Sequence, residues 1–486
     1  MNPTTENKLH FWLPFWGIVC INLLLKGIFV TYNELSYDEP FSFFHAALGP
    51  ADIVKELIRG NNPPLYELFM HYWMQLFGSS LFSVRFPSLI FSSFVPAFWF
   101  AGVYTVWRRP VAYVLAILLT FNNQQLMFAH EMRGYALAFF LAGAALFCFF
   151  RLRNLYVKVF FTAAFLALSL YTHYLSAFLA GTVWLFILLF GGDKRRGLWQ
   201  TSLLTILFVL PLAWTVYARV SDPGNTLWGN VPKISHLWGN INIAFNYRFW
   251  PLLGVFLLSM ADPKVRGRWK QVPYYSADIR QAGLLLAWFG FCYLLLFAVS
   301  FKWPMFMGRY LSFVFIALFV SVSFIVTYFY EAYTKTRGWL ILTVLVLISG
   351  FNWRQGNDYH PSRTAEELRR FRQQHGERSL VLVYPEWYQL TLGYYLSDEL
   401  RNSDVYTLRP RLLERGILPA QSPEEVQQRI GREAPLHILY VDAGEEFVFG
   451  NHAMYDMLKR AGYVESVPPL HTDKQVTLYT FRDPLP

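Results

Sequence analysis

Apolar residues gather into eleven long segments over the first 353 positions, and polar residues fall mainly between these segments. Most of the segments approach the roughly 20 residues that an α-helix needs to cross the hydrocarbon of a bilayer. The pattern therefore predicts a polytopic α-helical membrane protein. We expect spans at residues 11–30, 86–107, 111–128, 135–150, 159–171, 175–190, 198–217, 249–260, 282–301, 308–330 and 338–353.

The pattern changes after residue 353, where charged residues become frequent and short apolar runs alternate with helical periodicity. Residues 379–384 and 437–442 are typical of strands, and residues 364–375, 423–432 and 454–461 are typical of helices. We therefore expect a transmembrane domain at 1–353 and an external α/β domain at 354–486. The latter lacks a glycine-rich phosphate loop, which argues against nucleotide binding.

Composition supports the membrane assignment, since 55% of the 486 residues are hydrophobic and only 15% are charged. The net charge of +10 does not indicate nucleic-acid binding, because the basic residues form short clusters in alternate loops. Under the positive-inside rule, this distribution places the N-terminus in the cytoplasm and, after eleven spans, the C-terminal domain outside. Three cysteines, all within apolar spans, predict no disulfide framework.

Polar residues with possible chemistry follow the odd-numbered spans, so the topology places them on one external face. They are Asp38, Glu131, His173, Arg219, Arg248 and Arg309. The first external loop, residues 31–85, is the longest of these regions in the early chain. Within it we expect surface helices at 41–48 and 53–58, and a third helix at 65–77 that begins after Pro63-Pro64.

Asp38 and Glu39 are adjacent carboxylates directly after the first span. Acidic residues beside a span are often solvated interfacial groups without further function. Here, the long polar and aromatic loop that follows favours a general base, Asp38, with a supporting carboxylate, Glu39. Lys26, inside the first span, is expected to reach the outer interface or to contact an anionic lipid head group.

Four further groups lie at external tips. Glu131 is expected to cap a helix, to contact a sugar hydroxyl or to help hold a divalent ion, and Arg133 to pair with it or bind a phosphate. Tyr135 is expected to form the wall of a sugar site. His173 is expected to be hydrogen-bonded at the interface, to ligate a metal or to contact a donor. Arg309 opens a span on the side where positive charge is scarce, which favours phosphate binding.

The ordered set of motifs resembles the GT-C glycosyltransferases. The set comprises Asp38-Glu39, Pro63-Pro64-Leu65-Tyr66, Arg85 with Pro87-Ser88, Glu131-x-Arg133-x-Tyr135, Tyr171-Thr172-His173-Tyr174 and Arg309-Tyr310. More narrowly, residues 11–353 resemble the bacterial branch related to protein O-mannosyltransferases and lipid A aminoarabinose transferases.

This resemblance implies an inverting membrane enzyme that takes a sugar from a polyprenyl-phosphate donor and passes it to a hydroxyl acceptor. Asp38 matches the family's catalytic base and Glu131 its second acidic position. Asn62, Tyr66, Arg85, Arg133, Tyr135, His173 and Arg309 are expected to bind the donor phosphate or sugar. Where many relatives carry His or Lys before the Pro-Pro pair, this chain has Asn61-Asn62, which supplies no charge, so use of a divalent metal stays open.

The expected partners are the lipid-linked donor, membrane lipids and a lipid, protein or glycan acceptor, and the expected location is a bacterial inner membrane. A flippase or transporter of lipid-linked sugars is the alternative. Such a protein is expected to have inverted repeats and charges at the membrane midplane, whereas the charges here lie at loop tips, which favours an enzyme. A polysaccharide ligase or polymerase, with a large late external loop, is a third interpretation. The sugar and acceptor are not specified by the sequence.

Overall fold

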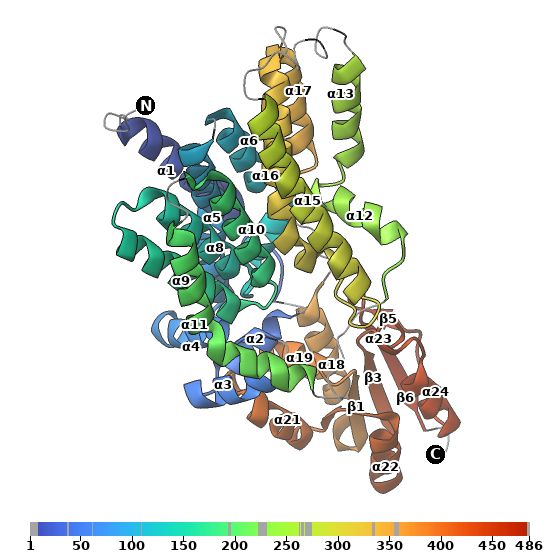
Figure 1. Ribbon diagram of the computed structural model, residues 1–486. Helices are drawn as coiled ribbons and strands as arrows, with labels where there is room; N and C mark the ends of the chain where they lie inside the picture. Colours follow the sequence, from blue (N-terminus) through green and yellow to red (C-terminus); the bar gives the residue numbers. More distant parts are fainter. Residues whose placement is uncertain are drawn as a thin grey trace. The chain divides into compact units, whose positions relative to one another are not determined.

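The computed structural model describes residues 8–35, 38–60, 62–107, 109–192, 196–221, 231–261, 263, 267, 275–332, 336–353 and 359–483. The chain divides into two compact units (Figure 1). The first unit contains residues 1–30, 55–66 and 85–355, and the second contains residues 31–54, 67–84 and 356–486. Asn61, which precedes Asn62 and the Pro-Pro pair, lies outside the described residues.

Each of the eleven expected spans is helical. Among the described residues, six helices are by themselves long and apolar enough to cross a membrane: α1 (Lys8–Gly27), α5 (Leu81–Val106), α9 (Leu155–Thr172), α11 (Arg196–Val220), α15 (Tyr275–Val299) and α16 (Gly308–Ala332). Three shorter apolar helices are α8 (Tyr135–Arg151), α10 (Ser176–Phe190) and α17 (Thr336–Ser349). The chain is therefore a multi-pass membrane protein with six to eight candidate spans, and the full count of eleven stays a prediction.

The expected span 111–128 is a bent pair of helices, and the expected span 249–260 is the second helix of another bent pair. α6 (Arg109–Thr120) and α7 (Asn123–His130) meet at 55°, and α12 (Ser235–Ala244) and α13 (Phe249–Ala261) meet at 82°. The first bend is stabilised by Asn122, whose side-chain oxygen accepts the backbone N–H groups of Gln124 and Gln125, both at 3.1 Å. Asparagine is a strong N-cap because it satisfies donors that have no partner inside the helix.

Two expectations about the start of the chain need correction. α5 begins at Leu81, five residues before the expected start of the second span, so Arg85 lies inside the helix. Lys26 neither reaches the interface nor is accessible to a lipid head group, because its side chain is fully buried. Its ammonium group donates to the backbone oxygen and hydroxyl of Ser92, at 3.0 and 2.9 Å.

The second unit contains the expected α/β fold. Its mixed sheet has the order β2-β1-β3-β6-β4, with β5 also paired to β6. The strands are β1 (Ser379–Tyr384), β2 (Ile417–Pro419), β3 (His437–Asp442), β4 (Val464–Glu465), β5 (Leu470–His471) and β6 (Thr477–Arg482). β1 is parallel to β2 and β3, whereas β6 is antiparallel to β3. Every residue of β1 is buried, as expected for a central strand.

The C-terminal part of this unit, residues 356–486, contains helices α18 (Pro361–His375), α19 (Tyr388–Leu396), α20 (Asp398–Arg401), α21 (Val405–Glu414), α22 (Pro423–Glu433), α23 (Glu445–Phe449) and α24 (Ala453–Arg460), with the 3₁₀ turn η2 (Gly376–Arg378). The two predicted strands and the helices corresponding to α18, α22 and α24 are confirmed. The helices expected in the first external loop are also present, as α2 (Glu39–Ala46), α3 (Pro50–Arg59) and α4 (Leu65–Phe77).

Helices α10 and α15 pack closely at Gly181. A Cβ atom at this position would lie 2.4 Å from Cζ2 of Trp288, and this indole is held in place because its Nε1 donates to Thr182 Oγ1 at 3.0 Å. A larger residue at this position would clash with the Trp288 ring, which cannot turn away without losing its hydrogen bond.

We predict that Gly181→Ala destabilises the protein by about 1–3 kcal/mol, the usual cost of adding a group to a filled interior. Thermal unfolding in detergent measures the effect. Gly283→Ala on α15 is the matched control, because a Cβ there meets no atom within 4 Å. Equal stability of the two variants would contradict the packing described here.

Candidate active site

Asp38 and Glu39 lie in the second unit, at the start of α2. Asp38 is the N-cap residue and is partly exposed, whereas Glu39 is in the first turn and only 3% exposed. Pro40 follows, with its fixed φ suited to a helix start. The adjacent carboxylates thus differ in environment: Asp38 is accessible to a reactant, and Glu39 is enclosed by protein.

The segment leading to Asp38 is held by side chains and backbone of the C-terminal α/β region. The N–H of Leu35 donates to the hydroxyl of Tyr395 at 2.6 Å. Both carboxylate oxygens of Glu34 accept hydrogen bonds from Ser362, one from its N–H at 2.8 Å and one from its hydroxyl at 2.5 Å. Burial, followed by the negative charge of Glu34, raises the pKa of Tyr395 above its ordinary value, so its hydroxyl stays protonated.

The part of the chain after Asp38 is fixed by apolar and polar contacts. The rings of Phe43 and Tyr394 meet edge-on, with centroids 5.0 Å apart. The Ser42 hydroxyl donates to Glu67 Oε1 at 2.8 Å, and a ring nitrogen of His71 lies 2.9 Å from the backbone oxygen of Ala46. Asp38 is therefore carried by a segment with anchors on both sides, which is the rigidity that a catalytic group needs.

The other predicted site residues belong to the first unit. Tyr66 is buried, and its hydroxyl lies 3.2 Å from Ser88 Oγ on α5. Arg85, on the same helix, is 2% exposed and donates to the backbone oxygen of Val30 at 3.0 Å. Asn62 is partly exposed, and no described contact joins it to the other predicted residues. The start of α5 thus holds a buried guanidinium group close to the end of α1.

The turn between α7 and α8 places the second acidic motif beside α9. The backbone N–H of Arg133 donates to the oxygen of Glu131 at 2.8 Å, and the Arg133 side chain is buried. A Cβ at Gly134 would lie 2.9 Å from the Thr172 methyl group and 3.3 Å from the Tyr66 Cβ atom. Only glycine therefore allows this turn to pack so closely against the two residues.

His173 connects the turn after α9 with α16. Its ring centroid lies 5.3 Å from Tyr135, 5.8 Å from Tyr310 and 4.6 Å from Phe313. Its Nδ1 accepts the N–H of Leu175 at 3.1 Å, so the neutral imidazole carries its proton on Nε2. The Arg309 guanidinium carbon lies 5.3 Å from the Tyr310 ring centre. The structure thus connects Tyr135, His173 and Arg309 through aromatic contacts.

The described residues contain one group of three possible metal ligands, but Glu131 and His173 do not belong to it. The group is Asp442, Glu445 and His452, whose ligand atoms lie within 4.8 Å of one another. Burial raises the pKa of both carboxyl groups, while hydrogen bonds from nearby backbone N–H groups act in the opposite direction. Sequence reasoning missed this group, although a buried strand that ends in Asp442 and is followed by two glutamates was a usable signal. Metal binding at Glu131 stays a prediction.

Solved structures with a similar fold span nearly the whole chain. ArnT from Cupriavidus metallidurans bound to undecaprenyl phosphate has 12% sequence identity and a TM-score of 0.50, with 97% of this chain and 98% of that chain covered. The Archaeoglobus fulgidus oligosaccharyltransferase in complex with Zn and sulfate has 11% identity and a TM-score of 0.46, with 96% and 73% covered. Neither a protein-family model nor a curated protein sequence matches the chain.

The likeness to this ArnT structure confirms the expected fold, a helical membrane domain followed by a small α/β domain. At 12% identity, the likeness to ArnT establishes the fold and not the reaction.

We predict that Tyr395→Phe loosens the segment before Asp38, because the Leu35 N–H loses its acceptor. Amide hydrogen exchange, followed by mass spectrometry, should become at least roughly tenfold faster at Leu35, since a lost buried hydrogen bond costs about 1–3 kcal/mol. Tyr406→Phe is the matched control, as Tyr406 is on α21 and 47% exposed. Unchanged protection at Leu35 would show that Tyr395 does not hold the segment.

Proposed function

We propose that the protein is an integral membrane glycosyltransferase that moves a sugar from a polyprenyl-phosphate donor to a hydroxyl acceptor. The observation that carries this proposal is the anchored, partly exposed Asp38 in a chain with the GT-C fold. The motifs that resemble this superfamily in sequence support it, as does the binding of undecaprenyl phosphate by the similar ArnT structure.

The proposed reaction is a single displacement with inversion at the anomeric carbon. The acceptor oxygen attacks that carbon as its bond to the phosphate oxygen breaks, and polyprenyl phosphate leaves with the bonding electron pair. Asp38 receives the hydroxyl proton as the new bond forms, because a carboxylate is too weak a base to remove it beforehand. Glu39, which is adjacent and buried, is the supporting carboxylate for Asp38.

The donor phosphate becomes more negative as the sugar leaves, so positive groups that face it favour the transition state. We assign this role to Arg85, Arg133 and Arg309, and donor contacts to Asn62, Tyr66, Tyr135 and His173. Arginine suits the task because its planar guanidinium group binds two phosphate oxygens at once. A divalent ion at Glu131 would add positive charge.

We further propose a bacterial inner membrane as the location, with the N-terminus in the cytoplasm and the active site and C-terminal domain on the periplasmic side. The positive charges in alternate loops support this orientation. The donor sugar is a hexose or pentose, and a mannosyltransferase-like activity is the narrower expectation from the sequence resemblance.

We predict that Asp38→Asn lowers turnover by about 10²–10⁴-fold, the usual loss when a general base is removed. The assay supplies a panel of polyprenyl-phosphate sugars to the protein in nanodiscs and measures donor consumption. Asp52→Asn is the matched control, because Asp52 is exposed on α3. Full activity of a folded Asp38→Asn variant would move the base elsewhere, with Glu39 and Glu131 next. Movement of lipid-linked sugar across liposomes without any donor consumption would support a transporter.

We predict that Arg309→Lys raises the Michaelis constant for the donor roughly tenfold, because lysine keeps the charge but loses the paired contact to phosphate. The same donor assay measures this constant. Arg280→Lys, at an exposed position on α15, is the matched control. An unchanged constant in the Arg309 variant would remove Arg309 from the donor site.

A further inference from the structure

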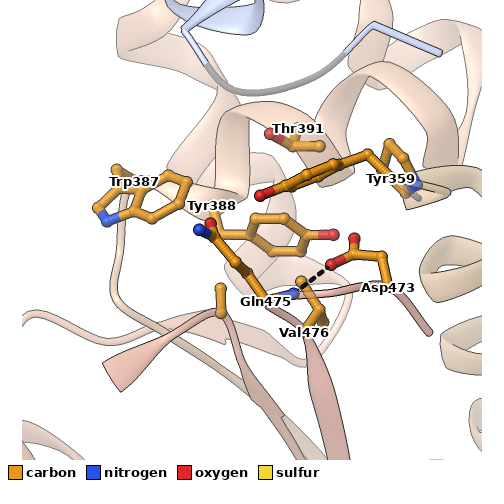
Figure 2. A pocket seen from close by; sticks show the side chains of 9 residues that line it. Tyr359, Trp387, Tyr388, Thr391, Asp473, Gln475 and Val476 are labelled. Atoms are coloured by element: carbon orange, nitrogen blue, oxygen red, sulfur yellow. Dashed lines mark hydrogen bonds between the residues drawn. The ribbon is translucent and has the colours of Figure 1, made fainter. Parts of the chain in front are cut away.

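A small pocket lies in the C-terminal α/β region, between α19 and the turn that connects β5 and β6. Its walls include the aromatic side chains of Tyr359, Trp387 and Tyr388, together with the polar side chains of Asp473 and Gln475. In Figure 2, Trp387 and Asp473 lie on either side of the Tyr388 ring. All these residues belong to the second unit, and none of them takes part in the proposed reaction.

Asp473 presents an unsatisfied carboxylate oxygen within this pocket. Its Oδ1 accepts the backbone N–H of Gln475 at 2.8 Å, which fixes the side chain in the turn. Its Oδ2 is buried and accepts no hydrogen bond from any described part of the chain. A buried carboxylate oxygen without a donor is costly, so a ligand that supplies one is stabilised at this position.

A second carboxylate, that of Glu34, lies near Asp473. Glu34 lies close enough to act on Asp473 and Tyr388 electrostatically, and its carboxylate is held by Ser362, next to the pocket residue Pro361. Burial raises the pKa of the Asp473 carboxyl group, and Glu34 adds to this, while two backbone N–H groups and His360 act in the opposite direction. A cationic ligand group both donates to Asp473 Oδ2 and neutralises its charge, whereas a neutral hydroxyl group only donates.

The size and walls of the pocket restrict the ligand further. Its cavity volume is about 20 Å³. This volume holds one small polar group but not a whole sugar ring. Aromatic faces attract cations through their electron-rich surface, and such walls next to a carboxylate are suited to an ammonium group. Trp387 is 36% exposed, so its indole remains available to the carbon skeleton of a ligand outside this cavity.

We propose that this pocket binds the primary ammonium group of an amine-bearing ligand, with Asp473 Oδ2 as the acceptor and the rings of Tyr359, Tyr388 and Trp387 as the walls. Two sources share this chemistry, an amino sugar and an aminoalkyl head group. The site does not depend on the proposed glycosyl transfer, because none of the residues that bind the ammonium group takes part in that reaction.

Calorimetric titration of the full chain tests the proposal, using nanodiscs of a lipid without amino groups so that the membrane supplies no competing ligand. Glucosamine is compared with glucose, and ethanolamine with ethylene glycol, at neutral pH. We expect the amines to bind and the neutral partners to bind at least roughly tenfold more weakly, the ratio typical of a charge-assisted hydrogen bond. Binding of both amines identifies the ammonium group itself, whereas binding of glucosamine alone identifies an amino sugar.

Asp473→Asn is the decisive variant, because asparagine keeps the Oδ1 acceptor of the turn and replaces the charged Oδ2 acceptor with a neutral NH2 group. We expect amine affinity to fall at least roughly tenfold, with an unchanged thermal midpoint. Asp456→Asn, at an exposed position on α24, is the control for net charge and should bind amines normally. Equal binding of glucose and glucosamine, no amine binding, or full amine binding by a folded Asp473→Asn variant would each overturn the proposal.

Discussion

Hydrocarbon offers no hydrogen-bonding partner, so a polar group inside the first unit is stabilised when it finds a partner within the protein. A connected set of polar contacts between α1, α5, α6 and α7 supplies such partners. Asn22 donates to Thr120, and the backbone oxygen of Lys26 lies 2.6 Å from Nε2 of His130. The Ser92 hydroxyl, which receives Lys26, itself donates to the backbone oxygen of Gln125 at 2.8 Å. These contacts determine how the helices pack.

The same constraint explains the bent helices. A backbone break at membrane depth leaves donors and acceptors that water cannot satisfy. Asn122 and Asn246 supply the missing partners at two breaks: Asn122 donates to the oxygen of Ala244 at 2.9 Å, and Asn246 accepts the N–H of Asn123 at 2.9 Å. The two bends therefore stabilise each other through these hydrogen bonds.

In the second unit, rigidity comes from a different source. The sheet has a buried central strand, and the loop that carries Asp38 is attached to this region through Glu34, Leu35 and the rings of Phe43 and Phe44. If this loop were flexible, the entropy cost of ordering it in each catalytic cycle would lower the rate of the reaction. In the proposed enzyme, the C-terminal region therefore has a positioning role in addition to any contact with an acceptor.

The sequence by itself determined the membrane class, the positions of the apolar helices, the two central strands and the helices of the first external loop. These features depend on local periodicity and on the Pro63-Pro64 signal, which neighbouring residues in the sequence carry. The same local information indicated Asp38, Glu131, His173 and Arg309 as site candidates. Only the tertiary structure decided that Lys26 pairs with Ser92, that Tyr395 and Ser362 hold the Asp38 segment, and that Asp473 Oδ2 is buried without a donor. Such contacts join residues tens to hundreds of positions apart, and a single sequence carries no record of which distant side chains meet or which polar atoms lose their water.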